Sequence, residues 1–419
     1  MRSMGTSLAA MTLGVSLVAI AAPAFAQTTL TLGSWRTEDL AVWQDQILPV
    51  FNAAHPDIKV EFSPINTNEY NAAIQSQVEG GAGPDLITCR PFDVNNDWIS
   101  RGFFSKLDGF GGLANFTDTA KAAWTWDGST YCVPVAAVLA GFFYNVDIFN
   151  ELGIAPPTSA ADFIAVLQKI KDNGKYAPLA LGSADGWQLA YNGLYSMGPA
   201  YWKGEEGRLG LIDGTKKLTD PDFVAAFQAY DDLKPFLPSG QEAITYPDMT
   251  QLFTLGKAAI LPDGSWNINQ VTSTGLNVGA FGPPPVDAGG QRYLQEMPDM
   301  GIGINAKSAN QDAAKVFLDW VSGAEFQQLY VSTAPGFFAM STLPVTYENK
   351  LAQDFANLKT DAKLTPRLAL DRLSAGTPPL DDETWRLLQV MMTTDTTPEQ
   401  VTAELQAGLS SWYKPQMAK

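Results

Sequence analysis

Apolar and polar positions near the start of the chain follow two periodicities in turn. Residues 28–33, 59–62 and 84–87 are short runs of strand-forming residues and predict three strands. Between the first two runs, apolar residues recur every three or four positions, which predicts a helix with a kink at Pro49. The stripe of this helix consists of Leu40, Trp43, Ile47 and Phe51. Residues 68–79 predict a second helix, which a pair of glycines ends.

The order strand, helix, strand, helix, strand is typical of a parallel sheet with helices on its faces. In such sheets, ligands bind beyond the carboxyl ends of the strands. The segments that fall there are 34–38, 64–68 and 90–93, and they are polar and aromatic where the preceding strands are apolar. This contrast predicts a ligand site at that edge of the sheet.

Three later helices are predicted from the residues that would cap them. Ser159 stands three residues before Asp162, Asp220 precedes a proline, and Asn310 precedes an apolar stripe. No internal repeat or low-complexity linker interrupts the pattern. The length suggests two domains, or three, and we expect strands rather than a flexible tether to join them.

The first 26 residues have the features of a cleaved export signal. Arg2 provides a basic start, residues 8–22 are almost wholly apolar, and residues 24–26 form a small-x-small cleavage site. The apolar run is too short for a membrane anchor, and the first cysteine, Cys89, lies too far from the cleavage point to carry a lipid. We therefore expect a periplasmic protein without a lipid anchor.

The charge of the chain narrows the class of partner. The net charge of −17 becomes about −18 once Arg2 is removed, and such a chain repels nucleic acids and anionic lipids. Solubility alone is the other explanation of the charge. The apolar fraction of 46% and the 11 tryptophans exclude disorder.

The sequence does not decide whether the two cysteines form a disulfide. Cys89 and Cys132 lie in apolar, strand-like runs, so they form either one disulfide or two buried thiols. Together with the only histidine, His55, they do not make a zinc site of any familiar spacing, and no cofactor is expected.

Five segments resemble, in order, the extracellular solute-binding proteins of the maltose-binding type, the binding components of carbohydrate ABC importers. They begin with Phe51-Asn52-x-x-His55-Pro56-Asp57 and continue with Gly83-Pro84-Asp85-Leu86-Ile87. The others are Val133-Pro134 with Phe143-Tyr144-Asn145, then Gly256-Lys257-Ala258-Ala259-Ile260 with Asp263-Gly264-Ser265-Trp266, and Gly301-Ile302-Gly303-Ile304-Asn305.

The resemblance implies a two-lobed α/β fold of the periplasmic binding protein type, with three crossover segments and a central ligand cleft. We expect the crossings near 134–141, 261–265 and 324–335. The first lobe would then hold residues 27–135 plus 266–325, and the second 136–265 plus 326–419.

The resemblance also implies a mechanism and a partner. The lobes of such proteins close around a ligand, and a transmembrane permease driven by an ATPase reads the closed form. This chain has no Gly-x-x-x-x-Gly-Lys-Ser/Thr motif, so it contains no P-loop ATPase. We expect a monomer that binds a small carbohydrate and the permease subunits of an ABC importer.

Candidate ligand-binding residues in the first lobe follow the predicted strands. Trp35 would stack on a sugar, and Arg36 and Glu38 would bind its hydroxyl groups; a helix-start contact and surface charges are the alternatives. Asn68 is a candidate that would also serve as an N-cap. The pair Arg90 and Asp93 follows an apolar strand directly, and charges so placed need partners in the site or in the loop.

The remaining candidates come from later in the chain. Trp266, with Asp263, stands where the resembled family commonly has a stacking aromatic beside a crossover. Trp187 lies in a loop and would be an opposing ring or a structural residue. Phe337 and Arg372 correspond to a glycine-rich turn and a late polar or aromatic residue of the family.

Two other functions compete with neutral-sugar binding. A glycosidase needs two carboxylates across the scissile bond, but the chain has no Gly-x-Ser-x-Gly and no His-Glu-x-x-His, and His55 is poorly placed for acid–base work. An anionic or sulfonated sugar would need Arg36, Arg90 and Arg372 to converge. The many aromatic residues and mixed charges favour a neutral saccharide of one to three units.

Overall fold

A computed structural model describes residues 27–417, except for the side chains of Asp93 and Asp371. The expected export signal, residues 1–26, lies outside the described residues. Within the described part, no helix is long and apolar enough to cross a membrane.

The amino-terminal sheet follows the predicted pattern. Strand β1 (Thr28–Ser34) lies between β2 (Ile58–Pro64) and β3 (Leu86–Cys89), and both pairings are parallel. The predicted first helix consists of α1 (Leu40–Val42), a π-helical turn and α2 (Leu48–Ala54). Because Pro49 has no N–H to donate, the backbone hydrogen bonds change to the wider π-helical pattern just before it.

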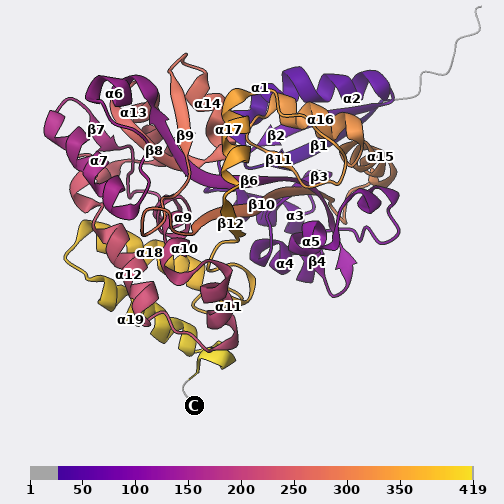
Figure 1. Cartoon of the computed structure of the whole chain (residues 1–419). Coiled ribbons are helices and arrows are strands. Elements are labelled where there is room, and N and C mark those ends of the chain that lie inside the picture. Colours follow the sequence, from indigo (N-terminus) through magenta and orange to yellow (C-terminus); the bar gives the residue numbers. More distant parts are fainter. Residues whose placement is uncertain (1–26, 418–419) are drawn as a thin grey trace, which may run out of the picture.

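Two long strands run through the middle of the molecule (Figure 1). Strand β6 (Cys132–Asn145) and strand β10 (Arg292–Ile304) pair with each other in antiparallel register. One end of the pair continues through β10 to β3 and the amino-terminal sheet. The other end of β6 pairs with β8 (Ala258–Gly264) and with β9 (Val278–Phe281). Both lobes therefore share one hydrogen-bonded framework.

Short strands and the helices of the first lobe complete its faces. The short strands are β4 (Thr125–Trp126) and β5 (Ser129–Thr130), while β11 (Phe338–Ala339) pairs with the crossing strand β6. The helices are α3 (Tyr70–Glu79), α4 (Asp93–Ser100), α5 (Asp118–Lys121), α15 (Gln311–Val321) and α16 (Ala324–Thr333). Asn310 does not cap α15 with its side chain as predicted, because its amide donates to Asp85 Oδ1 instead, at 3.1 Å.

The second lobe adds strands β7 (Ala177–Leu179) and β12 (Ala362–Thr365) and most of the helices. Ser159 caps its helix as predicted, accepting a hydrogen bond from the Asp162 backbone at 3.1 Å. The helices are α6 (Val146–Leu152), α7 (Ala160–Asn173), α8 (Gly186–Gln188), α9 (Tyr195–Met197), α10 (Pro199–Trp202), α11 (Glu205–Asp213), α12 (Pro221–Asp231), α13 (Tyr246–Thr254), α14 (Ile268–Thr272), α17 (Lys350–Leu358), α18 (Leu380–Thr393) and α19 (Pro398–Ser410).

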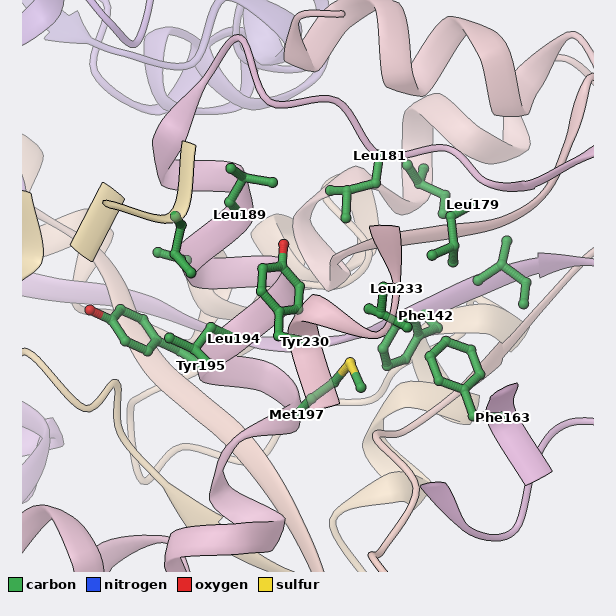
Figure 2. Close-up of a cluster of buried hydrophobic side chains, with 14 of the residues drawn as sticks. Phe142, Phe163, Leu179, Leu181, Leu189, Leu194, Tyr195, Met197, Tyr230 and Leu233 are labelled. Atoms are coloured by element: carbon green, nitrogen blue, oxygen red, sulfur yellow. The ribbon is translucent and has the colours of Figure 1, made fainter. Parts of the chain in front are cut away.

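Two buried cores lie on either side of the crossing strands. The first includes Trp43, Trp98 and Trp124, which are almost fully buried. The second, shown in part in Figure 2, includes Phe142 of β6 and Phe163 of α7. A disulfide joins Cys89 of β3 to Cys132 of β6, which decides the alternative that the sequence left open.

The cores also indicate where the chain passes between lobes. Strands β6 and β10 contribute to both cores, and a third passage falls between Phe337, in the first core, and Phe338, in the second. Helix α16 packs in the first core, so it is not a crossover, although we expected one at 324–335. Helix α14 and β9 pack on the second core, not on the first as the expected boundary at 266 implied. We therefore propose crossings at β6, β10 and 337–338.

Candidate functional site

Charged and aromatic side chains from both lobes meet where β6 and β10 cross between them. We call this set the interlobe site. The first lobe contributes Trp35, Arg36, Glu38, Arg90, Asp299 and Phe337. The second contributes Trp187, Tyr191, Tyr246, Arg367, Asp381 and Trp385.

The lobes are in direct contact beside this set. The Asn68 side-chain amide, which follows β2, donates to Asp185 Oδ1 of the second lobe at 3.2 Å. Asp185 also accepts from the Tyr246 backbone N–H through Oδ2, at 2.8 Å. The candidate Asn68 therefore lies at the rim, where it connects the lobes, and it is exposed.

The loop after β1 holds a buried arginine among three carboxylates. Arg36 is only 3% exposed; it donates to Asp39, forms an ion pair with Glu38 at 3.1 Å and lies 4.0 Å from Asp299. Its guanidinium also covers the ring of Phe337, with 4.4 Å between the guanidinium carbon and the ring centre. Burial raises the pKa of Asp39, although Arg36 opposes that effect. Arg36 is thus held by several partners, while the Glu38 side chain stays 38% exposed to solvent.

The loop after β3 provides a second arginine with neutral partners. Arg90 lies over the ring of Trp35, 4.4 Å from its centre, and donates to Asn71 Oδ1 at 2.9 Å and to Thr67 at 3.0 Å. Burial lowers the pKa of Arg90. Phe92, two residues later, has φ 55° and ψ −114°, a strained backbone for a residue with a side chain. The paired candidate Asp93 has a side chain outside the described residues.

Strand β10 contributes an aspartate that the sequence analysis did not select. Asp299 lies where the register of β10 against β6 shifts, between Pro298 and Met300. Such bulges redirect side chains at functional sites. Burial raises the pKa of Asp299, with Arg36 and Arg90 opposing the effect. The loop rule for parallel strands does not point to this residue, because Asp299 lies inside β10, in the part of the strand that is antiparallel to β6.

The second lobe presents a tyrosine between an arginine and an aspartate. The Tyr191 hydroxyl donates to Asp381 Oδ2 at 2.7 Å, and the guanidinium carbon of Arg367 lies 3.8 Å from the Tyr191 ring centre. Arg367 Nη1 lies 3.9 Å from Asp381 Oδ2, and Trp385 meets the Tyr191 ring edge-on at 5.5 Å. Sequence reasoning did not select any residue of this group.

Trp187 and Tyr246 pack edge-on against each other, and we call this pair the aromatic wall. A hydrogen-bonded network joins the wall to the end of β8. Trp266 Nε1 donates to the Tyr246 hydroxyl at 2.8 Å, and that hydroxyl donates to Asp263 Oδ2 at 3.2 Å. Asp263 is fully buried and also accepts from Asn192, Asn267 and the Gly264 N–H. Burial raises its pKa to about 7 against these donors. Asp263 is therefore occupied within the protein, and Trp266 is 9% exposed.

The other candidates divide between the site and the surface. Trp187 packs edge-on against Tyr246, with 5.0 Å between ring centres, and so belongs to the wall. Phe337 is buried beneath Arg36. Arg372 is exposed, and Arg367, not Arg372, is the arginine that meets Tyr191.

The set has the chemistry to bind a polar solute with apolar faces. Guanidinium groups and carboxylates offer charged hydrogen bonds, and tryptophan and tyrosine rings offer stacking surfaces. In the described part of the chain, no group of three or more His, Cys, Asp or Glu residues is arranged to hold a metal ion.

Comparison with known proteins agrees with this chemistry. The family described as bacterial extracellular solute-binding protein matches residues 33–328, so the chain belongs to that family. The family consists of binding proteins and not of enzymes, as expected, and supplies the solute-binding components of ABC importers. Its proteins are secreted, which fits the expected export of this chain.

Individual relatives are distant. A Multiple sugar-binding protein of Streptococcus mutans is 24% identical over 297 residues, which cover 68% of this chain and 69% of that protein. A Maltotriose-binding protein of Pyrococcus abyssi is 25% identical over 300 residues, 67% of this chain but only 59% of that protein. The structure of the bacterial solute receptor AcbH superposes with a TM-score of 0.80 at 18% identity and covers 92% of this chain and 100% of that one. This likeness confirms the two-lobed α/β fold.

Proposed function

We propose that this protein captures a mono- to oligosaccharide between its lobes and delivers it to the permease of an ABC importer. The observation that carries the proposal is the interlobe site, where Trp35 and Arg90 of one lobe stand opposite Tyr191 and Asp381 of the other. Relatives that bear the names of sugar-binding and maltotriose-binding proteins support a carbohydrate cargo.

The energetics of such a site are sufficient. A hydrogen bond from a sugar hydroxyl to a charged group contributes about 1.5–3 kcal/mol, and stacking on a ring contributes on the order of 1 kcal/mol. Four or five contacts of these kinds reach about −8 kcal/mol, the free energy of micromolar binding. Ordering of the lobes subtracts from this sum, which makes contacts from both lobes necessary.

An anionic or sulfonated sugar is the second candidate. Arg90 favours it, because its hydrogen-bond partners are neutral groups. Arg36 and Arg367 favour an uncharged sugar, since each already faces a carboxylate. Two of the three guanidinium groups are thus compensated within the protein, and we place the neutral sugar first.

The remaining parts of the proposal follow from the chain and its framework. Residues 1–26 direct export and are cleaved, the product stays in the periplasm without a lipid anchor, and it acts as a monomer. Closure bends the segments that connect the lobes, chiefly β6 and β10. The permease then recognises and binds the closed form of the protein.

A binding screen tests the function. We expect the mature protein to melt several degrees higher with at least one neutral sugar, and calorimetry to show that the sugar is bound and recovered intact. Arg90→Ala should lose this shift, while Lys59→Ala should keep it, because Lys59 is an exposed residue of β2 that pairs with Glu61 on the same strand. If no sugar shifts the melting temperature, the cargo class is wrong. If the sugar is cleaved, the protein is an enzyme.

A further inference from the structure

We propose that the carboxylates of Asp299 and Asp381 recognise the ligand, one from each side of the interlobe site. Each would accept a hydrogen bond from a separate hydroxyl group of an uncharged sugar. This inference rests on the proposed function and deepens it, because it assigns specificity to two residues.

Asp299 has an acceptor that the protein leaves unused. Its side chain is 12% exposed, and Oδ2 receives no hydrogen bond from any residue between 27 and 417. The nearest guanidinium nitrogen, on Arg36, is 4.0 Å away, which is too far for a hydrogen bond. Buried polar atoms without a partner are rare and costly, so this oxygen needs an explanation. A ligand hydroxyl would provide the missing donor.

The backbone at Asp299 supports the same interpretation. The residue sits at the register shift of β10, opposite the Ala136 and Ala137 segment of β6, where the regular ladder is interrupted. Pro298, just before it, has no N–H for the ladder. A bulge at this point turns the carboxylate out of the strand-pair pattern, toward Arg36 of the first lobe.

Asp381 repeats the arrangement in the second lobe. It lies in the first turn of α18, and the Tyr191 hydroxyl occupies its Oδ2 at 2.7 Å. Its other oxygen, Oδ1, is buried and receives no hydrogen bond from the described residues. Tyr191 therefore fixes the orientation of the carboxylate and leaves one oxygen for a ligand. Nearby, the buried Nε1 of Trp385 is a donor without an acceptor in the same part of the chain.

The two carboxylates belong to one electrostatic environment. Arg367, the neighbour of Asp381, acts on the ionisation of Asp299, and Tyr191 acts on that of Arg90. The three atoms named above, which have no hydrogen-bond partner among residues 27–417, are two acceptors and one donor. A hydroxyl group both donates and accepts, so a polyhydroxylated ligand satisfies all three.

The same groups select against charge on the ligand. A carboxylate, sulfonate or phosphate brought to Asp299 or Asp381 would meet like charge and could not donate a hydrogen bond. A cationic ligand would meet like charge at Arg90, whose hydrogen-bond partners are neutral groups. An uncharged sugar with two free hydroxyl groups in reach is the ligand class that remains.

Calorimetry with variants of the mature protein tests the inference. The probes are D-galactose, D-glucose, maltotriose, raffinose and D-galacturonate, and the variants are measured with the neutral probe that the unaltered protein binds most tightly. We expect Asp299→Asn and Asp381→Asn each to weaken binding by roughly tenfold or more, because each loses a charged acceptor. The matched controls are Glu296→Gln on β10 and Asp382→Asn on α18. Their affinity for the probe should stay within about twofold of that of the unaltered protein.

Deoxy sugars identify the hydroxyl groups concerned. A deoxy analogue that the unaltered protein binds weakly should bind the matching Asn variant with no further loss, which a purely structural effect of the variant would not produce. Melting temperatures of the variants show whether they fold.

The outcomes separate the two proposals. If the unaltered protein binds a neutral probe and both folded Asn variants bind it equally well, the assignment of Asp299 and Asp381 is wrong and the function stands. Tighter binding of D-galacturonate than of any neutral probe also overturns the assignment. If the unaltered protein binds none of the probes, the proposed function itself fails.

Discussion

Asp263 makes the stability of this protein depend on pH near neutrality. Its carboxyl group is fully buried, and burial raises the pKa from 3.8 to about 7. A group whose pKa is higher in the folded state stabilises that state most at low pH, and this stabilisation is lost as the pH rises toward the folded pKa. A difference of about three pH units corresponds to about 4 kcal/mol in full.

About half of this effect on the free energy of unfolding falls between pH 5 and pH 7. Between pH 5 and pH 7, linkage predicts that ionisation of Asp263 alone lowers the free energy of unfolding by about 2 kcal/mol. Asp39 and Asp299, whose pKa values are also raised by burial, act in the same direction. The carboxyl groups of Asp85 and Asp248 have lowered pKa values, so their opposite effect falls at more acidic pH.

The test compares pH profiles and not single stabilities. Asp263→Asn cannot titrate, and it also places an amide among donors, so we expect it to be less stable at pH 5 by about 1–3 kcal/mol. Urea unfolding followed by tryptophan fluorescence at pH 5, 6 and 7 gives the free energy of unfolding at each pH. Over this range it should fall by about 2 kcal/mol less for Asp263→Asn than for the unaltered protein. Asp312→Asn, at a fully exposed position, should keep the slope of the unaltered protein. Parallel profiles for the unaltered protein and Asp263→Asn would refute the reasoning.

Three further predictions concern the interlobe site and its connections. Arg90→Lys keeps the charge but loses the flat contact with Trp35, and we expect sugar affinity to fall about threefold to thirtyfold by calorimetry; unchanged affinity would remove Arg90 from the site. Gly336→Ala places a side chain at φ 96° and 1.9 Å from the Ser265 carbonyl oxygen, so it should destabilise the protein by about 2–4 kcal/mol in thermal unfolding, and an unaltered melting temperature would contradict this. Asn68→Ala removes the hydrogen bond to Asp185, and small-angle scattering of the sugar-free protein should show a larger radius of gyration; an identical radius would mean that this bond does not hold the lobes together.

The amino-terminal half of the fold could be predicted from apolar periodicity alone. Strands β1, β2 and β3 lie where alternating and apolar runs placed them, because each run is long enough to bury one side or both. The positions where the chain passes between lobes were harder to predict from the sequence. Helix α16 has an apolar face like that of any core helix, and its place in the first lobe depends on ring contacts of Phe326 and Tyr330 with Trp43, which is far away in the sequence.

The site was predicted in part for the same reason. Trp35, Arg36 and Arg90 follow parallel strands directly, and the position of such residues follows from sheet topology. Tyr191, Arg367 and Asp381 come from a helix, a loop and a helix start, and no local pattern brings them together. Asp263 was expected to bind ligand, but its four donors are visible only in three dimensions.

The register shift at Asp299 has a consequence for any attempt to change the cargo. Strand β10 is irregular at the same residue whose Oδ2 atom we propose as a hydrogen-bond acceptor for the ligand. Selectivity and the ease of closing are therefore not separate properties at this position. A variant of Asp299 chosen for a new sugar will also shift the balance between open and closed protein. Redesign of the cargo should begin at Asp381, which lies on a helix outside the crossing strands.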